Sequence, residues 1–135
     1  MEYKAIAKNV KISPRKVRLV ADAIKSLTPD VALTKLAVVA KRGAGPIEKV
    51  IKSAIANAVN NAKATKENLV IKELYVTEGV TYKRFHFAAR GRVHPYKKRT
   101  SHITVILEDK AVKELPAPKV KTETDIEVVK KGGKK

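Results

Sequence analysis

The sequence predicts an α+β fold with a short N-terminal strand, three helices and one long antiparallel β-hairpin. Two changes of pattern along the chain lead to this prediction. Apolar residues recur with a helical period up to about residue 63, and β-branched and apolar residues take over from residue 69. A wholly basic segment then lies between two strand-like runs. With 135 residues, the chain is long enough for one domain with a substantial core.

The first elements are a strand over residues 3–10, where apolar and polar residues alternate loosely, and a helix that begins at Ser13 and Pro14. Serine can cap the free N–H groups of a first turn, and proline has the backbone angle that the first helical position requires. One face of this helix is apolar and consists of Val17, Val20, Ala21 and Ile24. The other side carries the basic residues Arg15, Lys16, Arg18 and Lys25.

Two further helices follow. A second start signal at Thr28 and Pro29 predicts a helix over residues 31–40, which basic, Gly and Pro residues then end. The third helix, over about residues 46–63, has the clearest helical period in the chain. Its asparagines allow two interpretations, a solvated face near the helix end or amide contacts to RNA sugars and phosphates. They are Asn57, Asn60 and Asn61.

The hairpin is predicted from two alternating runs, residues 69–78 and 102–108, which can lie on a core. The turn is expected near residues 88–92, where Gly91 can adopt a positive φ. The outer part, residues 80–98, has charges on both faces and no apolar stripe, so we expect it to leave the domain. At about 3.3 Å per residue, each arm would project on the order of 30 Å. A two-stranded ribbon alone is marginally stable, so we expect its order to come from a partner.

Charge indicates what that partner is. The net charge is +17, which favours binding to a polyanion, most commonly a nucleic acid. Residues 79–107 hold seven Lys and Arg and no acid, whereas 1–78 hold fifteen bases and seven acids, and 108–135 hold eight and six. An anionic membrane would require a basic amphipathic helix with an aromatic face, and the chain has no Trp. We therefore expect no membrane partner.

Four aromatic residues alternate with the bases of the hairpin, and this pattern also has two interpretations. Rings interleaved with cations suit single-stranded or looped RNA, whose bases can stack on them. Alternatively, the rings brace the ribbon across its strands. The four residues are Tyr82, Phe85, Phe87 and Tyr96.

Several classes of function are not expected. His86, His94 and His102 lie among cations, and the nearest acids are Glu78 and Glu108, which argues against both an enzyme and a metal site. The chain has no Cys, so disulfides and thiolate ligands are excluded, and no nucleotide-binding glycine motif points to a cofactor. No apolar run approaches the roughly 20 residues of a membrane span, and the N-terminus, with an acid at position 2 and no apolar stretch, is not expected to be a secretory signal. The lack of Cys fits a reducing, cytoplasmic location.

Three motifs carry a resemblance to a known family: SPRKVRLVADAI at 13–24, SAIANAVNNA at 53–62 and KRTSHITV at 98–105. Together they resemble the bacterial large-subunit ribosomal proteins numbered twenty-two, over about residues 9–108. The resemblance implies three helices packed on a small three-stranded antiparallel sheet, with a long protruding hairpin. It implies one domain over 1–110, made of a globular part (1–79 and 99–110) and a hairpin (80–98). Residues 111–135 would be a flexible Lys- and Pro-rich extension.

The resemblance also implies partners and site residues. The family binds large-subunit ribosomal RNA, aids subunit assembly and lines the nascent-polypeptide exit tunnel with its hairpin tip, beside another ribosomal protein that shares the constriction. The RNA-binding residues would be Ser13, Arg15, Lys16, Arg18, Lys83, Arg84, Arg90, Arg92, Lys97, Lys98, Arg99, Thr100, Ser101 and His102. The tip that lines the tunnel would be Phe87, Ala88, Ala89, Arg90, Gly91 and Arg92. Phe87-Ala88 stands where the family often has Pro-Arg, so this tip is bulkier and less charged.

The residues alone also allow a free-standing architectural protein that grips nucleic acid with a cationic β-ribbon arm. Such a protein is usually an obligate dimer with a symmetric pair of arms. Sedimentation distinguishes the two hypotheses, because a ribosomal protein travels with the large subunit in high-salt sucrose gradients.

Overall fold

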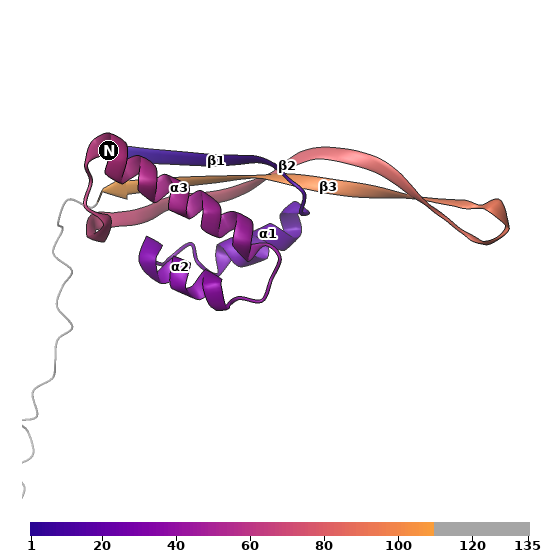
Figure 1. The fold of residues 1–135 in the computed structure, drawn as a ribbon, viewed down its shortest axis with the longest axis horizontal. Helices are drawn as coiled ribbons and strands as arrows, with labels where there is room; N and C mark the ends of the chain where they lie inside the picture. Colours follow the sequence, from indigo (N-terminus) through magenta and orange to yellow (C-terminus); the bar gives the residue numbers. More distant parts are fainter. Residues whose placement is uncertain (110–135) are drawn as a thin grey trace, which may run out of the picture.

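A computed structural model describes residues 1–109 and confirms the α+β fold, with three α-helices and one three-stranded antiparallel sheet. The strands lie in the order β1-β3-β2. All three helices lie on one side of the sheet, and the β2–β3 hairpin projects beyond them (Figure 1). The elements are β1 (Glu2–Val10), α1 (Pro14–Asp22), α2 (Pro29–Val38), α3 (Ala44–Ala62), η1 (Lys66–Asn68), β2 (Leu69–Phe87), η2 (Ala89–Gly91) and β3 (Val93–Asp109). The expected extension over 111–135 lies outside the described residues.

Helix starts differ from the sequence prediction in two details. The Ser13 side chain makes no capping hydrogen bond, and its backbone carbonyl instead accepts from the amides of Lys16 and Val17. Helix α3 begins at Ala44, two residues before the expected start at Pro46, so Gly45 and Pro46 both lie in its first turn. Proline is tolerated there because the first amides of a helix have no acceptor within the helix.

The core lies between the helices and the sheet. Ile47 and Ile51 of α3 are fully buried, and Ala54 and Ala58 on the same face are small enough to let this helix approach the strands closely. From the sheet, β3 contributes Ile103, Val105 and Leu107, all with no exposed surface. Burial of each large aliphatic side chain stabilises the fold by about 1.5–3 kcal/mol. The inner ends of β2 and β3 are thus held firmly in the body.

Beyond Glu78 the two strands leave the body but stay paired. The register shifts between Glu78 and Thr81, and pairing then continues to Phe87 opposite Val93. Arg90 and Gly91 take positive φ angles of 60° and 69° in the short turn at the tip, as predicted for Gly91. Figure 1 shows the outer hairpin extending away from the helices, without folding back onto them.

A close backbone approach holds the base of the hairpin. A Cβ atom placed on Gly79 would lie only 2.5 Å from the Thr100 hydroxyl oxygen. That hydroxyl donates a 2.7 Å hydrogen bond to the carbonyl of Val80. Glycine at position 79 therefore makes room for a buried threonine that ties β2 to β3 where they emerge.

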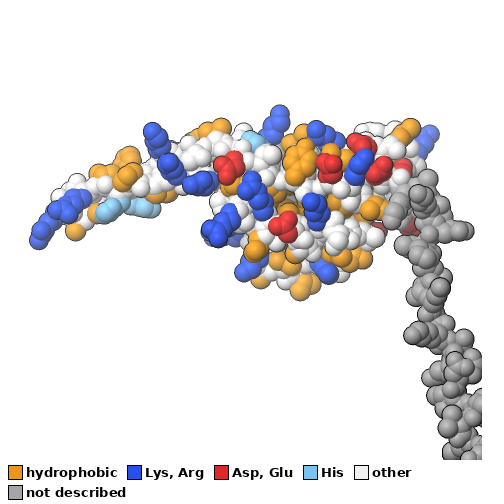
Figure 2. All heavy atoms as spheres, turned by 180° about the vertical axis from the view of Figure 1, so that it is seen from behind, with side chains coloured by type: hydrophobic (Ala, Val, Ile, Leu, Met, Phe, Trp, Pro, Cys, Tyr) orange, Lys and Arg blue, Asp and Glu red, His pale blue; other side chains and the backbone are white. Residues whose placement is uncertain are grey.

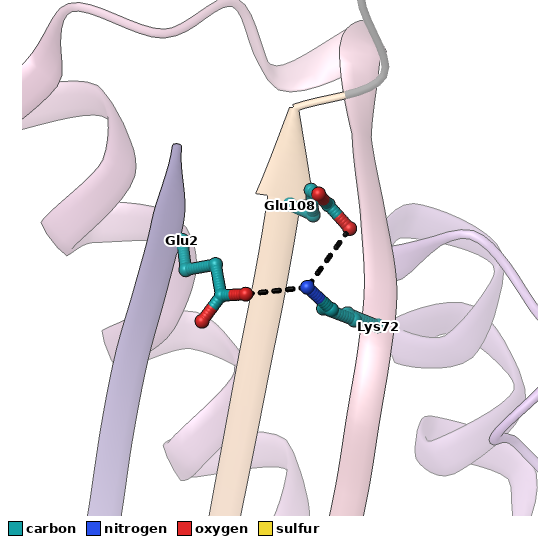
Figure 3. Close-up of polar contacts among 3 residues, drawn as sticks. All are labelled: Glu2, Lys72 and Glu108. Carbon is teal, nitrogen blue, oxygen red and sulfur yellow. Dashed lines mark hydrogen bonds and ion pairs between the residues drawn. The ribbon is translucent and has the colours of Figure 1, made fainter.

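The open face of the sheet carries an ion-pair cluster at the end remote from the hairpin tip. Lys72 of β2 reaches over the central strand to the carboxylate of Glu2 on β1, and its Nζ lies 3.6 Å from Glu108 Oε2 (Figure 3). The hydrogen bond to Glu2 is the main cause of a raised pKa at Lys72, and the same bond lowers the pKa of Glu2. The cluster joins the two edge strands.

Within residues 1–109, no helix has both the length and the apolarity needed to cross a bilayer.

Candidate nucleic-acid interface

The pairing of the outer hairpin assigns its side chains to two faces, since opposed residues share a face and successive residues alternate. Phe85 is opposite Pro95 and Phe87 is opposite Val93. These four residues form an exposed apolar group, which we call the phenylalanine patch. Its two rings meet edge to face with centroids 5.5 Å apart. The expectation that the outer hairpin has no apolar stripe is therefore wrong near the tip, because the register brings the four residues onto one face.

The opposite face of the hairpin carries the other rings. The His86 ring stacks on Tyr96 with a centroid distance of 4.4 Å and an interplanar angle of 10°. The Arg84 guanidinium lies 5.5 Å from the centre of the Tyr82 ring. The rings thus brace the ribbon, yet Tyr82 and Tyr96 keep 41% and 40% of their surface exposed. Both interpretations of the aromatic pattern are therefore compatible with the geometry.

Most of the predicted RNA-binding cations are exposed on the hairpin or at its base. Arg18 has a structural contact as well, because its Nε donates a 3.1 Å hydrogen bond to the carbonyl of Val76 and so joins α1 to β2. The exposed cations of the predicted set are Arg15, Lys16, Arg18, Lys83, Arg84, Arg90, Arg92, Lys97, Lys98 and Arg99. Ser13 is half-buried at the start of α1.

Three other predicted residues face inward or are engaged within the chain. Thr100 and Ser101 are buried, and the Ser101 hydroxyl has no hydrogen-bond partner among the described residues. His102 is half-buried, and its Nδ1 accepts a 2.9 Å hydrogen bond from the backbone amide of Asn9. These contacts hold the base of the hairpin, so the geometry adds no support to the predicted RNA contacts of these three side chains.

Among the asparagines of α3, Asn57 has a structural contact. Its Nδ2 donates a 3.3 Å hydrogen bond to the carbonyl of Lys4 on β1. This bond favours a role in packing α3 against the sheet over an amide contact to RNA.

The interface cations have no acidic partner within the described part of the chain. The ion pairs there join Lys52 to Glu48, and Lys72 to Glu2 and Glu108. Figure 2 shows basic side chains at the tip of the hairpin and again toward its base, with hydrophobic and His side chains between them, whereas acidic side chains lie over the body and the hairpin base. Repulsion among the hairpin cations is therefore left for an external anion to offset.

Two pockets flank Arg99 at the hairpin base. One, which we call the arginine pocket, has a volume of about 520 Å³ and is lined by Ser13, Pro14, Arg15, Arg18, Glu78 and Arg99. The other, which we call the basic pocket, has a volume of about 550 Å³ and adds Lys11, Lys41 and Arg42 to Lys16 and Arg99. The sequence analysis missed these three bases. They lie in two loops some thirty residues apart, and nothing in their local pattern shows that the loops meet.

No metal centre accompanies these pockets in the described region. Residues 1–109 contain no group of three or more His, Cys, Asp or Glu side chains that could hold a metal ion. The chemistry that the arrangement does offer is recognition of anions by exposed guanidinium and ammonium groups.

Comparison with known proteins gives consistent matches. The family model described as ribosomal protein L22p/L17e matches residues 5–108. The chain is 53% identical over 110 residues to large ribosomal subunit protein uL22 of Thermus thermophilus, covering 82% of this chain and 97% of that protein. It is 46% identical over 112 residues to the protein of the same name from Mesoplasma florum, covering 83% of this chain and all of that protein. The corresponding protein of Oceanobacillus iheyensis is 50% identical over 111 residues, covering 82% of this chain and 97% of that protein.

Proposed function

Since the chain belongs to the ribosomal protein L22p/L17e family, we propose that it is a structural component of the large ribosomal subunit in the cytoplasm and binds large-subunit ribosomal RNA there. The proposal of RNA binding rests on the charge of the hairpin. Residues 79–107 hold seven Lys and Arg with no acid, and none of these cations is ion-paired within residues 1–109. A large polyphosphate is the partner that this arrangement fits.

The mechanism is structural. Cations on the two arms neutralise phosphates from RNA segments that are distant in sequence, which lowers the repulsion between them and fixes their packing during subunit assembly. The arginine pocket and the exposed bases of α1 anchor the body on RNA at the hairpin base. Arms of about nine residues project on the order of 30 Å. One chain can therefore contact RNA both at the hairpin base and at the outer end of the hairpin.

The tip has a different role in this proposal. Residues 87–92 line the polypeptide exit tunnel, where they face the nascent polypeptide and a neighbouring ribosomal protein that shares the constriction. Two features support this assignment: the tip is the outermost part of the hairpin, and Phe87 is 83% exposed beside two alanines. The apolar part of this tip, residues 87–89, suits contact with polypeptide better than contact with phosphate, whereas Arg90 and Arg92 belong to the proposed RNA-binding set.

Charge-removing variants test RNA binding. Replacing Lys97, Lys98 and Arg99 with Ala should weaken binding to purified large-subunit ribosomal RNA. The slope of log K against log salt concentration should become less steep by about 3, because each phosphate contact contributes about 0.9 to its magnitude. The measurement is a filter-binding titration at several salt concentrations.

The matched control replaces Lys130, Lys131 and Lys134, which lie outside the described residues, and so removes the same net charge. An equal loss of RNA affinity in this control would show that binding depends only on total net charge and not on the position of the bases. Sedimentation of the wild-type chain apart from the large subunit in high-salt sucrose gradients would favour a free-standing architectural protein instead.

A further inference from the structure

The basic pocket has a composition that plain phosphate binding does not explain. Its volume of about 550 Å³ is in the range of small-molecule sites. Three separate regions meet there: the loop before α1 with the first turns of α1, the loop between α2 and α3, and the base of β3. Five cations line it, namely Lys11, Lys16, Lys41, Arg42 and Arg99.

The charge of this pocket calls for an anion. No acid is among its lining residues, in contrast to the arginine pocket, which includes Glu78. None of its five cations is ion-paired within the described residues. Five like charges on three regions that fold together repel one another, and a bound phosphate offsets that repulsion.

The walls of the pocket are apolar as well. Ile12, Leu19 and Ala40 line it, and Leu19 leaves 67% of its surface exposed on α1. A Cβ placed on Gly43 would lie 3.4 Å from the carbonyl oxygen of Lys16. The loop between α2 and α3 therefore packs directly on α1 beside the pocket.

A cationic rim around an apolar wall matches the two halves of a nucleotide. The phosphate suits the lysines, and a flat base suits the leucine and the planar guanidinium groups of Arg42 and Arg99, on which bases stack. Bases inside an RNA helix are stacked and paired, so they cannot enter a cavity. An unpaired nucleotide turned out of its helix can.

We propose that the basic pocket binds one unpaired nucleotide extruded from the RNA against which the body packs. The inference rests on the RNA binding proposed above and adds a subsite to it. The phosphate lies among Lys11, Lys16 and Lys41, and the base lies against Leu19 between the two arginines.

The test compares two small probes that share a phosphate group. The full chain, labelled with ¹⁵N, is titrated with adenosine 5′-monophosphate and with ribose 5-phosphate, which has no base. We expect the nucleotide to bind at least about fivefold more tightly and to shift the amide signals of Leu19, Ala40 and Gly43. Equal affinity would overturn the proposal, because the pocket would then bind phosphate alone.

Two variants that each add one negative charge test whether the preference for the nucleotide arises in the basic pocket. Ala40→Glu places a carboxylate in the pocket, whereas Val38→Glu places one on a residue that is 83% exposed and outside the pocket lining. The preference for the nucleotide should disappear in the first variant and persist in the second. Loss of the preference in both variants, or in neither, would contradict the proposal. Leu19→Ala is a second, uncharged variant that should lower the preference without adding charge.

Binding of wild-type chain to large-subunit ribosomal RNA is measured in parallel. Absence of that binding would overturn the proposed function itself. Normal RNA binding together with equal affinity for the two small probes would overturn the nucleotide subsite alone.

Discussion

Gly79 and Thr100 together determine how the hairpin leaves the body. The threonine is buried, and its hydroxyl spans the two strands by a bond to the Val80 carbonyl. Only a residue without a side chain leaves space for that hydroxyl, because a Cβ on position 79 would approach it to 2.5 Å. A glycine and a buried hydroxyl thus hold the two strands together at this point, whereas elsewhere in the core larger apolar side chains do so by packing.

Gly79→Ala should therefore destabilise the chain by about 1–3 kcal/mol, as expected when an extra methyl group is forced into a packed site. Urea unfolding followed by circular dichroism measures the loss. The matched control is Gly45→Ala, since a Cβ there meets nothing within 4 Å. The control lies in the first turn of α3 and should be neutral or stabilising by up to about 1 kcal/mol. A stability for Gly79→Ala equal to that of the control would show that the threonine moves at no cost.

Tyr3 and Asp109 make a second local pair that can be tested. The phenol of Tyr3 donates a 2.7 Å hydrogen bond to Asp109, and this bond, with burial and the carboxylate charge, raises the pKa of Tyr3. The neutral phenol is the favoured form in the folded chain. Its contribution to stability is therefore complete below the ordinary tyrosine pKa of about 10 and is lost as the pH rises through the raised value.

Asp109→Asn should move the pKa of Tyr3 back toward the ordinary tyrosine value, because the carboxylate charge is removed. Titration of phenolate absorbance follows all four tyrosines, and the transition at highest pH should shift to lower pH. Tyr3→Phe should remove that transition altogether and so assign it. Glu67→Gln, which removes an exposed carboxylate elsewhere, should leave the titration unchanged.

Among the elements, the helices and the inner strands were predictable and the faces of the hairpin were not. The apolar period over residues 46–63 predicted a helix there, and Ile47, Ile51 and Ala54 on its apolar face are all buried. In a hairpin, by contrast, a shift of one residue in register exchanges the two faces. The register shift between Glu78 and Thr81 was not visible in the sequence. For this reason the burial of Thr100 and Ser101 and the phenylalanine patch were missed.

Of the candidate interface, the hairpin bases were predictable from the sequence and the basic pocket was not. The hairpin bases form one continuous run, so their common role could be inferred from composition alone. The basic pocket depends on two loops that meet only in the folded chain, and its bases Lys11, Lys41 and Arg42 could not be grouped by sequence spacing.

Shortening the hairpin should leave the stability of the body unchanged. In the variant, residues 83–97 are replaced by Asn-Gly, which favours a tight turn between Tyr82 and Lys98. The removed side chains are exposed except for the half-buried Ala88, so the free energy of unfolding should change by less than about 0.5 kcal/mol. Urea unfolding measures this change. Global unfolding of the variant would show that the outer hairpin is needed for the core.

For the whole molecule, the important property is the uneven distribution of charge along its length. Lys72, Glu2 and Glu108 form ion pairs at the end of the sheet remote from the tip, while residues 79–107 contain no acid. Association with RNA is therefore expected to be directional, with the hairpin and its base facing the phosphates. The end that bears the ion-pair cluster has little net charge to contribute.

The shortened variant also tests this distribution. It lacks five basic residues of the hairpin: Lys83, Arg84, Arg90, Arg92 and Lys97. The wild-type chain should bind ribosomal RNA with a slope of log K against log salt concentration on the order of −6 from its seven hairpin bases. In the variant the slope should become less steep by about 4.5. Binding titrations at several salt concentrations measure both slopes. An unchanged slope would mean that the hairpin bases meet no phosphates.

The strands β2 and β3 run without a break from the buried sheet to the turn at the tip, over 19 and 17 residues. A push or pull at the turn along the hairpin axis is therefore parallel to both backbones. Because the turn joins the two strands, such a load moves β2 and β3 together and acts as shear on the hydrogen bonds between β3 and β1. Many of these bonds must yield together before the hairpin slides. Mechanical load applied at the outer end is thus transmitted to the centre of the domain, and the turn cannot shift lengthwise unless the sheet moves with it.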